Sequence, residues 1–235
     1  MRVGIPVADL TAGLFCALGV LTALIEREKS GEGQWLHTSL LQSQAFMLDF
    51  QAARYLMQGE VAPQVGNEHP TSLPTNRFAT KDGAVNIAVV GDGIWKRFCK
   101  ALDQGDWADS ADYGTGDDRF KNRDQLNADI AEIMEQKTSA EWVDELTDAG
   151  VPCGPIYSID EMFADPQVQH LGIAQPIMTD PFGETQAVAQ PFELTRTPSS
   201  FAAPPPTRGQ HTEEILEELG ISTEEYAKLQ EQSVV

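Results

Sequence analysis

Residues 7–29, VADLTAGLFCALGVLTALIEREK, contain the apolar run on which the first part of the fold depends. Large aliphatic residues recur there at helical spacing, which predicts a helix over Leu10–Lys29. The residues that set this spacing are Leu14, Leu18, Leu21 and Ile25. Small residues on the other faces would let neighbouring backbone approach closely, so we expect this helix to be buried on more than one side. Asp9, directly before the helix, is expected to be its N-cap.

The composition is that of an acidic globular protein. The chain has 235 residues, of which 41% are hydrophobic, and this is enough for one large domain or two modest ones. Its 16 Lys and Arg against 36 Asp and Glu give a net charge of -20. We therefore expect it to bind neither nucleic acid nor an anionic membrane surface. A polyanionic ligand would need a local basic pocket or contacts supplied by other sequence.

The cysteines and the first apolar run bear on the cellular compartment. The 3 cysteines have no CxxC spacing, which is typical of a reducing cytosol. The apolar run Leu10–Ile25 resembles a signal peptide, but it is too short to span a bilayer and no small-residue cleavage site follows it. We therefore expect a cytoplasmic protein with no membrane segment.

Two loop-like stretches rich in proline divide the chain. Before the first, the pattern predicts a short buried strand at Gln34–Leu40 and a second helix over Leu41–Gln58. After it, the turn Lys81-Asp82-Gly83 between two apolar runs predicts a β-hairpin. The predicted divisions are 1–58 as part of a large domain, 59–75 as a linker, 76–190 as a small α/β domain, 191–212 as a second linker, and 213–235 as C-terminal helices returning to the large domain.

Helices are predicted for most of the remaining ordered sequence. Their ranges are 94–102, 122–136, 140–149, 213–219 and 223–232, with short strands near 173–178 and 186–189. Thr138 with Glu141, and Ser158 with Glu161, have the spacing of capping boxes at helix starts. Residues 150–155 are predicted to form a rigid turn or a short strand.

Asp9 has two interpretations that the residues alone leave open. It could be an ordinary helix cap. Alternatively, the helix N-terminus would favour its ionised form, which is the form that attacks a thioester carbonyl. The four histidines have no metal-ligand spacing, so we expect no metal site. Neither Cys16 nor Cys153 has a histidine partner that the spacing makes evident.

A set of short motifs occurs in a fixed order along essentially the whole chain. They are VADLTAG at 7–13, EREKSGEGQ at 26–34, GNEHP at 66–70, IWKRFC at 94–99, GVPCGPI at 150–156, ADPQV at 164–168 and GQHT at 209–212. In this order they resemble the family III CoA-transferases (CaiB/BaiF), which include formyl-CoA:oxalate and carnitine CoA-transferases.

The resemblance implies a transferase that moves CoA between an acyl-CoA and a carboxylic acid. Asp9 matches the position of the family's catalytic aspartate, which passes through an aspartyl–acyl anhydride and an aspartyl-CoA thioester. No cofactor is implied, because CoA is a cosubstrate. The implied fold is α/β, with a Rossmann-like large domain built from both chain ends, an inserted small domain, and a homodimer of interlocked subunits at full length.

The family's members carry a long N-terminal segment before the aspartate, and only eight residues precede Asp9 here. We expect the CoA-binding residues, which stay unassigned, mainly in that N-terminal half, and we expect this chain alone to be inactive. Two alternatives stay open. One is an α-methylacyl-CoA racemase-like isomerase that uses the aspartate as acid and base; the other is a non-catalytic subunit that only associates with a partner.

Overall fold

The computed structural model describes residues 3–179, 182–201 and 203–235 as a mixed α/β chain in two compact units, Met1–Pro155 and Ile156–Val235. The first unit holds helices α1 to α7 and the three-stranded sheet, and the second holds helices α8 to α11 and a hairpin. The predicted domain boundaries stay predictions, because this division is drawn at a different point in the chain.

Helix α1, Val7–Ser30, confirms the long helix predicted from the apolar run. Its N-cap is Pro6, and Asp9 is the third residue of the first turn with no capping role, so the prediction of Asp9 as the N-cap is wrong. Proline is favoured at a helix start because its fixed φ suits the helix and its missing N–H is not needed there. The helix ends at Gly31, whose φ of 78° permits a bond from its N–H to the Arg27 carbonyl.

The surface of α1 is far more exposed than its sequence pattern predicts. Thr11 and Ala12 are its only buried residues among those described, so burial on more than one side is not what the structure shows. The large apolar side chains left in solvent are Leu10, Leu14, Leu18, Leu21, Leu24 and Ile25. By length and composition α1 could cross a membrane, and the core helix of a soluble protein has the same properties.

The strand predicted at Gln34–Leu40 is absent, since residues 32–39 form neither helix nor strand. Trp35 is 89% exposed, and among the described residues no strand lies beside this segment to bond its backbone. Leu36 nevertheless packs on α1, because a Cβ added at Gly19 would come within 2.6 Å of its Cδ1 atom. A glycine there lets the returning chain approach the helix closely.

The second predicted helix is broken in two. Helix α2 spans Leu40–Phe46 and helix α3 spans Phe50–Gln58. Asp49 between them has a φ of 49°, which a continuous helix cannot contain. The Ser39 side chain accepts a hydrogen bond from the Gln42 N–H, so α2 begins with its own cap at that residue.

The hairpin predicted around Asp82-Gly83 is confirmed. Strand β1, Thr75–Ala79, pairs antiparallel with β2, Ala84–Ala88, and the short strand β3, Cys153–Pro155, pairs antiparallel with the other edge of β2. The order β1-β2-β3 makes β2 the central strand of the sheet. Residues 150–155 therefore contribute a strand as well as a turn.

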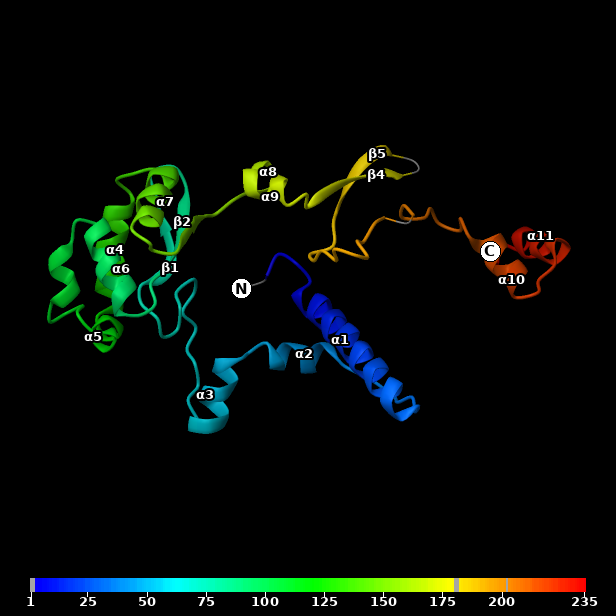
Figure 1. Ribbon diagram of the computed structural model, residues 1–235, viewed down its shortest axis with the longest axis horizontal. Helices are drawn as coiled ribbons and strands as arrows, with labels where there is room; N and C mark the ends of the chain where they lie inside the picture. The colour runs from blue at the N-terminus through cyan, green and yellow to red at the C-terminus, as the bar shows by residue number, and fades with distance from the viewer. Residues whose placement is uncertain (1–2, 180–181, 202) are drawn as a thin grey trace. The chain divides into compact units, whose positions relative to one another are not determined.

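Helices cover this sheet and close the main core (Figure 1). They are α4 (Asp92–Ala101), the 3-10 turn η1 (Gly105–Asp109), α5 (Gly116–Lys121), α6 (Arg123–Met134) and α7 (Ser139–Asp148). The core cluster draws all its buried members from residues 78–151, among them Val85, Ile87, Trp95, Phe98, Leu126, Ile130, Trp142 and Leu146. We call residues 75–155 the sheet unit.

The hairpin turn is tied to the start of α7. The Ser139 N–H donates to the Asp82 carboxylate at 2.8 Å, and the Thr80 and Ser139 hydroxyls lie 2.7 Å apart. The bond from the Ser139 N–H holds the pKa of Asp82 below its usual value. Thr138 and Glu141 form the predicted capping box at this helix.

The second unit has shorter elements. Its helices are α8 (Ile159–Ala164), α9 (Pro166–His170), α10 (Thr212–Glu218) and α11 (Thr223–Glu231), and strands β4 (Ala174–Thr179) and β5 (Gly183–Val188) form an antiparallel hairpin. The capping box predicted for Ser158 and Glu161 is present at α8. Thr179 is the single fully buried residue among those described in this unit, so its elements have little core of their own.

We predict that stability of the sheet unit depends on burial around β2. Val85 is 0% exposed and nearby Val90 is 59% exposed, so the two positions form a matched pair. Val85→Ala should lower the free energy of unfolding by about 2 kcal/mol, because it removes buried methyl groups and leaves a cavity. Val90→Ala should change it by less than about 0.5 kcal/mol. Urea denaturation followed by tryptophan fluorescence measures both; equal effects would contradict this placement of the core.

Candidate active site

Asp9 is exposed in the first turn of α1, where the unpaired N–H groups and the helix dipole favour a negative charge. The Leu10 N–H bonds to the Pro6 carbonyl at 3.0 Å, so the helix is already formed at this residue. Among the described residues, no side chain pairs with the Asp9 carboxylate. The carboxylate is therefore available to a molecule that reaches the helix start.

The turn that carries Asp9 is braced by α2. The Gln44 amide donates to the Thr11 hydroxyl at 2.8 Å, and that hydroxyl donates to the Val7 carbonyl at 2.8 Å. Phe15 and Phe46 meet edge to face one turn further along, with ring centroids 5.1 Å apart. Thr11 and Gln44 thus fix the backbone on either side of Asp9. Neither residue could be predicted from the sequence, because a bond across 33 residues leaves no local pattern.

The face of α1 that carries Asp9 is lined by small residues. Gly13 lies four residues after Asp9, and Cys16 lies three residues after Gly13, which places the three residues on one face of the helix. Gly13 and Cys16 are exposed, and no atom lies within 4 Å of a Cβ built on Gly13. This face has room for another group to approach the carboxylate.

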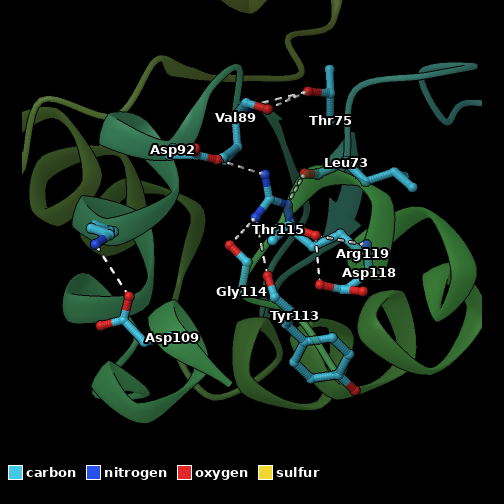
Figure 2. Close-up of polar contacts among 11 residues, drawn as sticks. Leu73, Thr75, Val89, Asp92, Asp109, Tyr113, Gly114, Thr115, Asp118 and Arg119 are labelled. Atoms are coloured by element: carbon cyan, nitrogen blue, oxygen red, sulfur yellow. Dashed lines mark hydrogen bonds and ion pairs between the residues drawn. The ribbon is translucent and has the colours of Figure 1, made fainter. Parts of the chain in front are cut away.

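A second polar cluster, centred on Arg119, lies inside the sheet unit (Figure 2). The guanidinium is 4% exposed and donates from Nε to the Leu73 carbonyl at 3.0 Å and from Nη1 to the Tyr113 carbonyl at 3.0 Å. It lies over the Trp95 ring, 4.8 Å from the ring centroid, and 3.5 Å from the exposed carboxylate of Asp92. These partners satisfy a buried cation, so the cluster is structural. Nothing in the sequence around Arg119 predicts this cluster, because its partners Leu73 and Trp95 lie far from it along the chain.

The metal-ligating residue types lie apart from one another in the part of the chain that the structure describes. In the described part of the chain, no three His, Cys, Asp or Glu side chains lie close enough together to hold a metal ion. His69 uses Nδ1 to accept bonds from the backbone N–H groups of Thr71 and Ser72. His37 is exposed in the unpaired segment, not on a strand.

The chain is similar to known CoA-transferases over nearly all its length. Residues 1–212 match CoA-transferase family III. It is 33% identical over 219 residues to succinyl-CoA:glutarate CoA-transferase of Homo sapiens, covering 93% of this chain and 50% of that protein. It is also 33% identical over 219 residues to succinate--glutarate CoA-transferase of Agrobacterium fabrum, covering 93% and 55%.

A solved structure agrees with these relatives. The fold superposes with a TM-score of 0.74 on the crystal structure of a CAIB/BAIF family protein from Brucella suis, at 29% identity, covering 93% of this chain and 57% of that one. The chain therefore belongs to CoA-transferase family III, as the ordered motifs predicted. It spans about half the length of the curated relatives that it matches.

We predict that the three thiols differ sharply in reactivity. Cys16 is exposed, Cys153 is half-buried, and burial raises the pKa of the Cys99 thiol to about 12. At about pH 8, iodoacetamide should alkylate Cys16 readily and Cys99 only after the chain is denatured, because the thiolate is the reactive form. Peptide mass spectrometry over a time course measures each site. Alkylation of Cys99 in the folded chain at the rate of Cys16 would contradict this environment.

Proposed function

We propose that this chain supplies the nucleophile-bearing part of a CoA-transferase, with Asp9 as the nucleophile. The observation that carries the proposal is the placement of Asp9, exposed in the first turn of an apolar helix and on a turn braced by Gln44. The motif around it agrees with the family's catalytic segment, and the chain belongs to that family. A carboxylate oxygen that a substrate can reach is a group able to attack a thioester carbonyl.

In the proposed reaction, an Asp9 oxygen attacks the thioester carbonyl of an acyl-CoA, and the carbon–sulfur bond breaks. CoA leaves as a thiolate, and an aspartyl–acyl anhydride remains. The thiolate then attacks the aspartyl carbonyl, which gives an aspartyl-CoA thioester and releases the donor carboxylate. An acceptor carboxylate attacks that thioester, its carbon–sulfur bond breaks, and CoA thiolate leaves behind an anhydride between Asp9 and the acceptor. The thiolate then attacks the acceptor's acyl carbonyl, which breaks the anhydride, yields the new acyl-CoA and restores the Asp9 carboxylate.

The rest of the proposed enzyme follows the family's architecture. Residues 1–58 and 213–235 would belong to a Rossmann-like large domain, and the small domain would span 76–190 between the two linkers. In that arrangement the exposed apolar side of α1 packs on the remainder of the large domain rather than entering a membrane. An N-terminal half would supply the contacts to polyanionic CoA that a chain of net charge -20 lacks. The full-length protein is proposed to be a cytoplasmic homodimer.

The racemase-like alternative differs in what happens at the α-carbon. An isomerase would exchange the α-proton of an α-methylacyl-CoA with solvent deuterium, whereas a transferase moves CoA without that exchange. The turn Cys153-Gly154-Pro155 favours the transferase. In the structure this turn is strand β3 on the edge of β2, so it belongs to the ordered part of the sheet unit.

We predict that Asp9 forms the covalent intermediate. The chain, joined to the N-terminal segment that precedes the aspartate in the family's members, is incubated with succinyl-CoA and then with hydroxylamine, which converts an activated aspartyl group to a hydroxamate. The mass change should map to the peptide that contains Asp9. Asp9→Asn should remove it and lower kcat at least about 1,000-fold, because the amide oxygen is a poor nucleophile. Asp49→Asn is the matched control, since Asn tolerates the left-handed φ there. A hydroxamate at another residue would contradict the role of Asp9.

We predict further that the isolated chain transfers little or no CoA. Succinyl-CoA and glutarate, taken from the names of two relatives, are suitable test substrates. Turnover should appear when the N-terminal half is joined, because the nucleophile alone cannot hold CoA in place. Liquid chromatography of the CoA esters measures transfer by both proteins. Robust turnover by residues 1–235 alone would show that the chain contains a complete CoA site.

A further inference from the structure

Two arginines, one helical turn apart in sequence, reach the stretch that leads into β1. Arg119 donates from Nε to the Leu73 carbonyl at 3.0 Å (Figure 2). Arg123 donates from Nε to a carboxylate oxygen of Glu68 at 3.0 Å, in an ion pair whose side chains are 19% and 26% exposed. Because both arginines belong to α5 and α6, this stretch is fixed to the sheet unit at two points, five residues apart.

The same stretch is also bonded to itself through His69. The His69 N–H donates to the Thr75 carbonyl at 2.8 Å. Its ring Nδ1 accepts from the N–H groups of Thr71 at 3.2 Å and Ser72 at 2.9 Å. Within residues 68–75, every residue except the two prolines therefore takes part in a hydrogen bond. The sequence predicts a linker for the same residues. The imidazole must carry its hydrogen on Nε2 to accept at Nδ1.

Residues 61–64, which precede the stretch 68–75, lack such hydrogen bonds in the described structure. Helix α3 ends at Gly59, with φ of 70°, and an ion pair between Arg54 and Glu60 closes its last turn. For residues 61–64 the described structure contains no hydrogen bond from backbone or side chain, and Val61 is 76% exposed. Pro63 also lacks an N–H that a partner could bind.

One contact spans this unbonded segment. The Phe50 ring of α3 stacks on the His69 imidazole, with centroids 5.7 Å apart and an angle of 12° between the planes. An offset stacked pair of this kind contributes about 1 kcal/mol. Such a contact can hold two parts together and still open readily at ambient temperature.

We propose that residues 68–75 form a clamp that moves with the sheet unit, that residues 61–64 are the hinge, and that the Phe50–His69 stack is its latch. Asp9 lies on the chain before the hinge, and the sheet unit lies after it. Opening at the hinge breaks the Phe50–His69 stack and none of the hydrogen bonds within the clamp. The residues that lead into β1 do not take part in this motion, because Arg119 and Arg123 bond them to the sheet unit.

Hydrogen exchange, read by mass spectrometry with residue-level fragmentation, tests the hinge and the clamp in the unmodified chain. The amides of Thr71, Ser72 and, on the edge strand β1, Asn76 and Phe78 should be protected, because alternate residues of an antiparallel edge strand bond to the neighbouring strand. The amides of Val61, Ala62 and Gln64 should exchange at close to the rate of unstructured peptide. Protection at 61–64 equal to that at 71–72 would overturn the hinge.

Substitutions separate the parts of the clamp. His69→Phe keeps a ring for stacking and removes the Nδ1 acceptor, so exchange at Thr71 and Ser72 should rise about fivefold or more. Glu68→Gln should raise exchange in the same segment by weakening the pair with Arg123. Arg77→Gln, at an exposed arginine of β1, is the matched control and should change neither. Amides of β2 report whether the sheet unit stays folded.

The latch is tested by proteolysis. Phe50→Leu removes the ring and leaves the clamp bonds intact, so cleavage at 61–64 by a non-specific protease should become severalfold faster while exchange at Thr71 and Ser72 stays unchanged. Unchanged cleavage overturns the latch. Unchanged exchange in both His69→Phe and Glu68→Gln, with β2 still protected, overturns the clamp. Arg119→Lys is a supporting variant only, because loss of this buried group can unfold the unit.

Discussion

Burial of the central strand β2 is the interaction on which the rest of the ordered structure depends. Val85 and Ile87 are completely buried on it, and helices α4, α6 and α7 cover it with Trp95, Ile130 and Trp142. At ~25 cal/mol for each Å² of apolar surface removed from water, such side chains supply most of the favourable free energy of a small domain. The Arg119 cluster and the turn at Asp82 add their bonds to a core that is already formed. These polar contacts lie at the edges of the apolar core and stabilise the loops there.

The elements outside that core show how far sequence reasoning reaches. The hairpin at Asp82-Gly83, the capping box at Thr138 and the helix over Leu10–Lys29 could be predicted because each depends on residues within a few positions of one another. The strand predicted at Gln34–Leu40 is absent, because a strand forms only where a neighbouring strand bonds its backbone. The predicted burial is wrong as well, since Trp35 is 89% exposed and Leu36 39% exposed, and nothing in the described chain provides that neighbour.

The candidate site divides in the same way. The ordered motifs identify Asp9 as the candidate nucleophile. Asp9 is not the N-cap of α1, but the third residue of a first turn also lies where the helix dipole favours a negative charge. Gln44 was not selected, since its bond to Thr11 joins helices that the sequence analysis treated separately. Asp49 was read as part of a continuous helix, although its left-handed backbone is what turns α3 away from α2.

The exposed apolar surface of α1 and the reactivity proposed for Asp9 would both change if further polypeptide packed on this helix. Leu14, Leu18 and Leu21 are 57–65% exposed, an arrangement that costs free energy in water and is relieved when other protein packs on the helix. A carboxylate in bulk water is well solvated and a weak nucleophile, and excluding water strengthens the electrostatic interactions that favour attack. If the polypeptide that buries the leucines also walls in the face of Asp9, Gly13 and Cys16, one packing event stabilises the helix and activates its carboxylate. A chain of this length would then carry the nucleophile in place, with its backbone already braced, and gain reactivity only on assembly.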